Sequence, residues 1–193
     1  MREAKVETLF RKMKIGEVYR RSDLEKYSAA VDRHLEALVK ANKVMRVSAG
    51  LYVRPQTSAF GAVPPDDKAL VSSFLKDDRF LVTSYNNYTQ LGLGLTQLYN
   101  NQIVYNYKRF GEFELAGRHF FFKRVPKFPR HLSKEFLLVD MLNNLKSLAE
   151  DELQVIENFL KLKGNFNAKK VLALAKEYAR PRTKKLLEKA YVK

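Results

Sequence analysis

The side chains that most often carry enzyme chemistry are few in this sequence and widely scattered. His34, His119 and His131 do not stand at metal-ligand spacing, and none belongs to a Ser-His-Asp or Glu-x-x-His arrangement. Paired carboxylates at residues 66–67 and 77–78 are of the type that binds Mg²⁺. Each pair, however, flanks a predicted helix, where the first favours the positive end of the helix dipole. We therefore expect no catalytic residues, no metal site, no cofactor and no enzymatic activity.

Basic side chains are the second source of chemistry, and they dominate the 193-residue chain. Its 36 Lys and Arg exceed 21 Asp and Glu, giving a formal charge of +15. Residues 1–55 carry 13 basic and 7 acidic residues, and residues 127–193 carry 15 and 8, whereas 56–126 carry 8 and 6. This excess indicates a polyanionic partner, with nucleic acid as the first candidate.

The composition also excludes several classes of protein. No cysteine is present, which excludes disulfides and cysteine-ligated zinc. No apolar run approaches the ~20 residues of a membrane-spanning helix. We expect a cytoplasmic protein with no membrane partner.

Local patterns at the N-terminus predict a helix ending at Gly16, a short strand, a short helix and a longer helix. Ser22-Asp-Leu-Glu25 has the form of a capping box at the start of the short helix. Ser28 is expected to cap the longer helix, and Asn42 to end it in a left-handed conformation. Two β-prone runs within residues 44–55 then predict a hairpin.

A single hairpin is marginally stable in water, so this one must pack against its own helices or on a partner. Helix-turn-helix followed by hairpin is the winged-helix arrangement, which we predict for residues 1–56 as a DNA-binding domain. Arg33 is placed to reach a guanine edge, while Asp32 and Glu36 on the same helix would repel phosphates. The expected DNA contacts are Ser28, Ala29, Ala30, Arg33, Lys40, Lys43 and Arg46, with Arg20, Arg21 and Arg54 as phosphate candidates.

Residues 57–193 predict a second domain, so that the whole chain is α+β. Gln56 to Pro65 is expected to be a linker. Residues 66–126 predict a small mixed sheet with a helix at 66–76, and 133–193 predict four helices that cover it. Gly92-Leu-Gly94 lacks the Lys-Ser/Thr ending of a phosphate loop and is interpreted as a turn.

Two further surfaces in this second domain leave alternatives open. Aromatic and basic residues interleave over residues 105–124. Either the aromatic rings stack on the bases of single-stranded RNA, or they alternate along the strands between the core and the surface. Three phenylalanines in a row, 120–122, must place at least one ring outside the core if they form a strand. The C-terminal helices add a basic surface at Arg180, Arg182, Lys184 and Lys185.

Two segments resemble the AbiEi-type antitoxins of type IV toxin–antitoxin systems. One runs from Ser22 to Pro55 and includes the wing Arg46-Val-Ser-Ala-Gly-Leu-Tyr52; the other is Tyr88-Thr-Gln-Leu-Gly-Leu-Gly-Leu-Thr-Gln97. The resemblance implies a winged-helix autorepressor that binds inverted repeats in its operon, self-associates on that DNA and counteracts a nucleotidyltransferase-like toxin. Relatives often carry a basic residue immediately before the wing glycine, where this chain has Ala49. An orphan regulator and a protein-interaction module remain the alternatives, with RNA binding by the aromatic sheet as a third.

Overall fold

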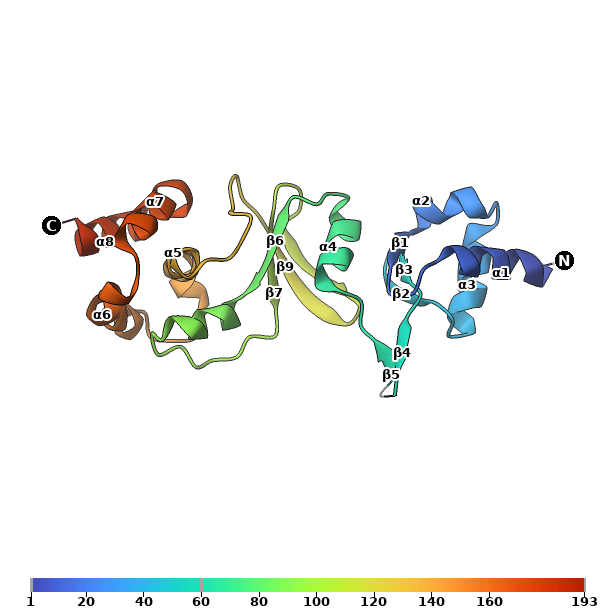
Figure 1. Ribbon diagram of the computed structural model, residues 1–193, viewed down its shortest axis with the longest axis horizontal. Coiled ribbons are helices and arrows are strands. Elements are labelled where there is room, and N and C mark those ends of the chain that lie inside the picture. Colours follow the sequence, from blue (N-terminus) through green and yellow to red (C-terminus); the bar gives the residue numbers. More distant parts are fainter. Residues whose placement is uncertain (1, 60, 193) are drawn as a thin grey trace. The chain divides into compact units, whose positions relative to one another are not determined.

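The computed structural model describes residues 2–59 and 61–192, and the chain divides into two compact units (Figure 1). The first comprises residues 1–79 and 111–120, and the second comprises 80–110 and 121–193. Strands and helices both occur in the N-terminal two thirds of the chain, and helices alone follow β9, which confirms the α+β class. The division does not coincide with the boundary expected at residue 56, because residues 57–79 and 111–120 also belong to the first unit.

The N-terminal part of the first unit has the expected order of elements. It contains α1 (Arg2–Lys12), β1 (Val18–Arg20), α2 (Arg21–Leu24), η1 (Glu25–Tyr27), α3 (Val31–Lys40), β2 (Met45–Ser48) and β3 (Leu51–Val53). β1 pairs antiparallel with β3, so that the hairpin becomes a three-stranded sheet in the order β1-β3-β2. The core of this part is formed by Leu9, Met13, Leu24, Val31, Leu35, Leu38 and Val44.

Several predicted helix ends in this part are wrong. α1 ends at Lys12, and Gly16, with φ +78°, instead donates its backbone N–H to Arg54 O at 2.8 Å. α2 begins directly after β1, and Asp23 accepts the bond from the Arg20 N–H at 3.4 Å, so that the expected box of Ser22 and Glu25 is not formed.

The start of α3 also differs from the expected cap, whereas its end agrees. Ala30 is the N-cap residue, and Ser28 Oγ accepts from the Ala30 N–H at 3.3 Å while it contacts His34 Nδ1 at 2.8 Å. The serine therefore fixes the turn before the helix. Asn42 has φ +54°, which confirms the expected left-handed residue after the helix.

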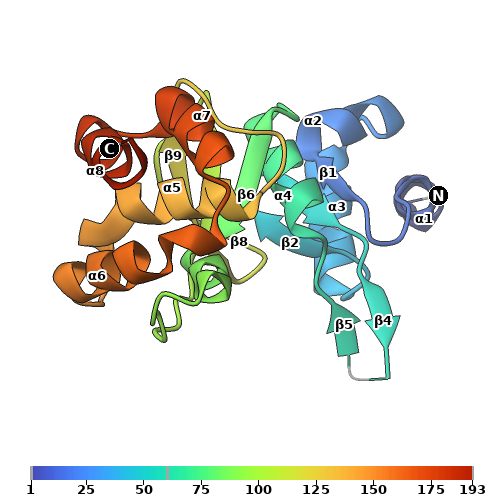
Figure 2. The same ribbon diagram turned by 60° about the vertical axis from the view of Figure 1, so that its left-hand side comes forward.

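The segment expected to be a linker is a hairpin. β4 (Gln56–Ser58) and β5 (Gly61–Val63) pair antiparallel, and their side chains are exposed. Figure 2 shows this hairpin below α4. α4 (Asp67–Leu75) follows, and Asp66 Oδ2 accepts from the Ala69 N–H at 3.1 Å as its N-cap. This first acid pair therefore lies at a helix N-terminus, as the sequence indicated.

A third hairpin of the first unit is built from β8 (Gly111–Leu115) and the beginning of β9 (Arg118–Arg124). Its turn residues Ala116 and Gly117 have φ values of +53° and +72°, and the Ala116 N–H donates to Val47 O at 2.8 Å. The predicted turn at these two residues is confirmed.

The second unit combines strands with a helical bundle. It contains β6 (Phe80–Ser84), η2 (Tyr85–Leu91), β7 (Gln102–Asn106) and the end of β9. The strand order of the sheet to which β6, β7 and β9 belong is β6-β7-β9-β8. β6 and β7 are antiparallel, with Phe80 opposite Asn106. The helices are α5 (Lys134–Asn144), η3 (Leu145–Ser147), α6 (Glu152–Leu162), η4 (Lys163–Asn165), α7 (Ala168–Tyr178) and α8 (Pro181–Tyr191).

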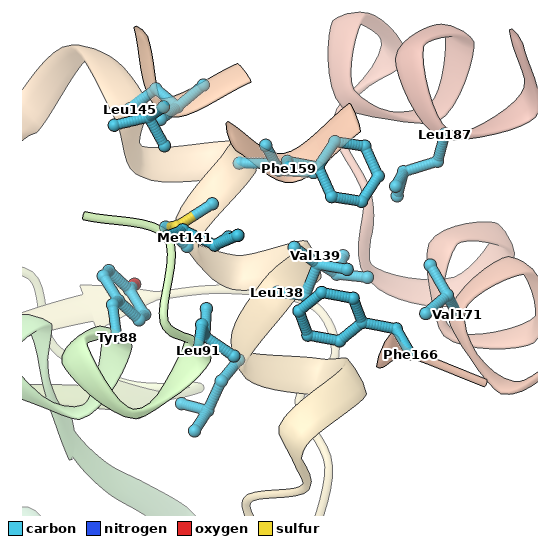
Figure 3. Packing of buried hydrophobic residues seen from close by; sticks show 14 of the residues in the cluster. Tyr88, Leu91, Leu138, Val139, Met141, Leu145, Phe159, Phe166, Val171 and Leu187 are labelled. Carbon is cyan, nitrogen blue, oxygen red and sulfur yellow. The ribbon is translucent and has the colours of Figure 1, made fainter. Parts of the chain in front are cut away.

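α5 is the central helix of this unit because every residue from Phe136 to Leu142 is buried. Figure 3 shows its side chains between η2 on one side and α6, α7 and α8 on the other, with Phe159 and Leu187 close to them. The leucines of the Leu91–Leu95 segment are also buried, and Gly92 and Gly94 have positive φ values of 69° and 82°. The interpretation of this segment as a turn is confirmed.

Candidate nucleic-acid interface and a buried polar cluster

The outer face of α3 is the surface that the sequence predicts to contact DNA. Asp32, Arg33, Glu36, Ala37 and Lys40 are exposed, whereas Val31, His34, Leu35 and Leu38 are buried. The predicted division of the helix into a packed side and an outer side is therefore confirmed. A shallow hollow at the beginning of the helix is lined by Ser28, Ala29, Ala30 and Arg33 among others.

Most cations near this face already have carboxylate partners. Arg21 donates from Nη2 to Asp32 Oδ2 at 2.6 Å and from Nη1 to Glu25. The hydrogen bond from Arg21 lowers the pKa of Asp32 below its ordinary value, and the bond from Lys40 does the same for Glu36. The two acids that would repel phosphates are therefore the groups that neutralise Arg21 and Lys40.

Lys40 and Lys43 complete this set of ion pairs. Lys40 Nζ lies 2.8 Å from Glu36 Oε1, and Lys43 Nζ lies 3.5 Å from Glu7 Oε2. All four side chains are substantially exposed, and exposed ion pairs contribute little to stability because water screens them. A phosphate group can therefore compete with Glu36 and Glu7 for these lysines.

Arg20 and Arg54 support the fold of the first unit. Arg20 Nε donates to Ser73 O at 2.8 Å, which connects β1 to α4. Arg54 Nη1 donates to Met13 O at 3.2 Å, and the guanidinium lies 4.1 Å from the centre of the Phe10 ring. Each is only partly exposed, so a phosphate contact would use the donors that remain.

Arg33 and Arg46 are the two predicted contacts that keep a free guanidinium. Both are exposed, and neither makes a hydrogen bond or ion pair with any part of residues 2–59 and 61–192. Arg33 lies on the outer face of α3, and Arg46 lies on β2, opposite Tyr52. The available positive charge of the predicted interface is therefore concentrated in one residue on the helix and one on the hairpin.

The excess positive charge of the chain resides mainly in the second unit. The first unit holds 17 basic and 13 acidic residues, and the second holds 19 and 8, so the net charges are +4 and +11. In the predicted C-terminal basic surface, Arg180 donates to Asn143 O at 3.1 Å and Arg182 pairs with Glu152 at 2.8 Å. Lys184 and Lys185 are exposed and pair with no carboxylate that the structure describes.

The aromatic segment follows the core-and-surface alternation that the sequence allowed. Phe120 and Phe122 are buried, whereas Phe121 is half-buried and its ring centre lies 5.6 Å from that of Phe110, which is 70% exposed. One of the three consecutive rings is therefore outside the core, as expected. This arrangement weakens the case for a continuous stacking surface.

A buried polar cluster in the second unit was not found by sequence reasoning. The Asp140 carboxylate accepts from Tyr88 Oη at 2.7 Å, from Tyr105 Oη at 2.6 Å and from Asn144 Nδ2 at 3.1 Å. Lys123 Nζ lies nearby, donating to Asn144 Oδ1 at 2.8 Å and to Tyr85 Oη at 2.9 Å. These hydrogen bonds satisfy a charged group in the core of the unit.

The electrostatics of this cluster follow from burial. Burial raises the pKa of Asp140 above its ordinary value, and the hydrogen bonds from Tyr105 and Tyr88 oppose that rise. Burial and the neighbouring carboxylate raise the pKa of Tyr88. A signal was present in the sequence, because Asp140 interrupts an apolar helical run and Asn144 follows it at i+4, on the same side.

Two further kinds of functional feature are absent from residues 2–59 and 61–192. No three His, Asp or Glu side chains gather into a cluster that could hold a metal ion. No helix in these ranges combines the length and apolar character needed to cross a membrane.

Comparisons with known proteins identify a likeness of fold. No family model matches the chain, and no curated protein matches it significantly. Among solved structures, the RV2827C protein from Mycobacterium tuberculosis matches with a TM-score of 0.57 and 16% identity, over 96% of this chain and 75% of that protein. At this level of identity, what the two chains share is the arrangement of their elements.

Proposed function

We propose that the protein binds double-stranded DNA, with residues 1–55 forming a winged helix. In this proposal α3 enters the major groove and the β2–β3 hairpin is the wing that contacts the adjacent backbone. The observation that carries it is the exposed face of α3, followed directly by a hairpin, with a free arginine on each. The small Ala29, just before α3, leaves room for close approach to the groove.

The proposed contacts differ in what they would read. Arg33 reaches a base edge, because a guanidinium can donate two parallel hydrogen bonds to guanine. Arg46 contacts phosphate. Lys40 and Lys43 join only where phosphates displace Glu36 and Glu7, so they add little to the salt dependence of binding while those ion pairs hold.

The wider role proposed is that of an antitoxin-like autorepressor in the cytoplasm, which binds inverted repeats and counteracts a nucleotidyltransferase-like toxin. Its support is the resemblance of residues 22–55 and 88–97 to AbiEi-type antitoxins. In the second of these segments Tyr88 and the leucines at 91, 93 and 95 are all buried, so these residues belong to the core of the second unit. Inverted repeats would place two copies on each site, with half-sites separated by whole helical turns.

A salt series of gel shifts tests the proposal. The purified chain is titrated onto the DNA upstream of its own gene and onto a shuffled fragment of equal length. Arg33→Ala is expected to weaken binding to the native fragment by ~1 to 3 kcal/mol and to reduce the difference between the fragments. Arg33→Lys keeps the charge but loses the bidentate geometry, so it should also reduce this difference.

The matched control is Lys68→Ala, which removes one positive charge from an exposed position of α4 in the same unit. It should change both fragments equally and slightly. Equal, salt-sensitive retention of the two fragments by the unmodified protein would contradict specific DNA binding. Stronger retention of single-stranded RNA, unaffected by Arg33→Ala, would favour the aromatic sheet instead.

A further inference from the structure

A pocket of about 450 Å³ lies in the second unit, above the buried polar cluster. Its lining comes from the end of β7, from β9 and the loop after it, from α5, and from residues 177–180 at the end of α7. The pocket therefore belongs to one unit and does not involve α3 or the β2–β3 hairpin. Its volume falls in the range of pockets that hold small organic ligands.

Aromatic rings form much of the pocket wall. Phe136 and Tyr178 meet edge to face, with ring centres 5.6 Å apart, and the ring of Phe128 is packed at 4.7 Å from that of Tyr107. These contacts hold the rings in place. Fixed aromatic rings provide flat apolar surface on which a planar ligand ring can stack.

Positive charge lines the same pocket at two depths. Lys123 is half-buried, and its ammonium group uses two of its three N–H donors on Asn144 Oδ1 and Tyr85 Oη. The third donor remains for an acceptor in the pocket. Lys127 and Arg180 are exposed and also belong to the lining, so they add charge where the pocket opens to solvent.

The acids of the pocket, Asp140 and Glu177, are fewer than its three cations. Asp140 belongs to the lining, but both of its oxygens already accept hydrogen bonds, from Tyr88 and Tyr105. Glu177 is exposed, and burial together with this neighbouring carboxylate raises the pKa of Tyr178. Three cations against two carboxylates leave a net charge of +1, which suits the pocket to a negatively charged group.

We propose that this pocket binds a small molecule that combines a planar ring with an anionic group. The ring stacks among Phe128, Phe136 and Tyr178, and the anion accepts from Lys123 with Lys127 and Arg180 nearby. Two sources supply this chemistry, nucleoside monophosphates and aromatic carboxylates. The proposal is independent of DNA binding, because it rests on residues of the second unit alone.

The test is isothermal titration of the full chain, without DNA. The probes are the four nucleoside 5′-monophosphates, their neutral nucleosides, benzoate, 4-hydroxybenzoate and indole-3-acetate, with inorganic phosphate and acetate as ring-free anions. Saturable binding of one ring-bearing anion, at least about tenfold tighter than its neutral or ring-free counterpart, is expected, as charge-assisted hydrogen bonds have this strength. Which probe binds then identifies the source. Saturation by none of them overturns the proposal, as does equal affinity for the ring-free anions.

Variants locate the binding. Lys123→Met should weaken binding about tenfold. Because this change also removes a hydrogen-bond partner of Asn144, a second variant is measured beside it. Lys127→Gln changes an exposed residue of the pocket and is expected to weaken binding several-fold. Lys169→Gln, at an exposed position near the beginning of α7 and outside the pocket, is the control of equal charge. If Lys127→Gln and Lys123→Met both bind as the control does, the ligand is not in this pocket and the proposal fails.

Discussion

Removal of one hydroxyl from the buried cluster, by Tyr88→Phe, gives a sharp test of how Asp140 is held. Tyr88 is fully buried, and its hydroxyl is the donor that Asp140 Oδ2 accepts at 2.7 Å. The substitution keeps the ring and its packing but leaves that oxygen without its donor. Hydrogen bonds to charged groups contribute ~1.5 to 3 kcal/mol, so we expect a loss of about 2 kcal/mol in the free energy of unfolding at neutral pH. For a chain of 193 residues that corresponds to a fall of roughly 4 to 8 °C in Tm.

The same variant carries a predicted pH dependence. Burial raises the folded-state pKa of Asp140, so stability falls as pH rises from the ordinary pKa of Asp to the raised folded value, and is then constant. The Tyr88 hydrogen bond lowers that folded pKa, and its removal therefore extends the decline to higher pH. The loss in Tyr88→Phe should be larger at neutral pH than at acid pH, where Asp140 is protonated.

Scanning calorimetry or circular dichroism at several pH values measures both effects, with Tyr27→Phe as the control. Tyr27 is 38% exposed in the first unit, and its hydroxyl makes no hydrogen bond with any residue that the structure describes. The control should change stability by less than about 0.5 kcal/mol. Equal stability of the two variants at neutral pH, or a loss in Tyr88→Phe that grows as pH falls, would refute this account of the cluster.

Two further predictions concern the proposed interface and the backbone. Glu36→Gln releases Lys40 from its ion pair, so DNA affinity at low salt should rise. The slope of log affinity against log salt should steepen by about 0.9, because one more phosphate is contacted. An unchanged slope in the gel-shift series would exclude Lys40 as a phosphate contact. Gly94→Ala and Gly50→Ala both place a side chain at positive φ, at a cost of ~1 to 2 kcal/mol each. At Gly94 the added Cβ would also lie 3.0 Å from Asn158 Nδ2, which donates to Leu93 O, whereas Gly50 has open space around it. Denaturant unfolding should therefore show the larger loss for Gly94→Ala, and equal losses would contradict this steric argument.

The order of helices and strands could be predicted from the sequence because it depends on local periodicity. The buried positions of α3 and the two-residue turn at Ala116-Gly117 are of this kind. Helix caps were predicted less well, since they depend on how the chain enters the helix. β1 continues directly into α2 and so moves the N-cap to Arg20, which a pattern of Ser and Glu does not reveal.

The electrostatics of the candidate sites depend on contacts between distant residues, and this is why sequence reasoning did not find them. Glu7 meets Lys43 only when α1 packs beside α3. Tyr88 and Tyr105 reach Asp140 across 52 and 35 residues of sequence. The sequence therefore predicted Arg20, Arg21 and Arg54 as phosphate contacts, but it could not reveal the contacts that these arginines make within the fold. The β4–β5 hairpin was missed because its short, exposed strands lack an apolar face.

The unequal charges of the two units, +4 and +11, have a consequence for how the protein would search for a site. Attraction to any polyanion grows with the number of counterions released, whereas discrimination between sequences depends on contacts with base edges. If α3 reads the bases, the unit that recognises the sequence is the one with the smaller charge. Capture of DNA and selection of a sequence would then be properties of different parts of the chain, and each could change in evolution without altering the other.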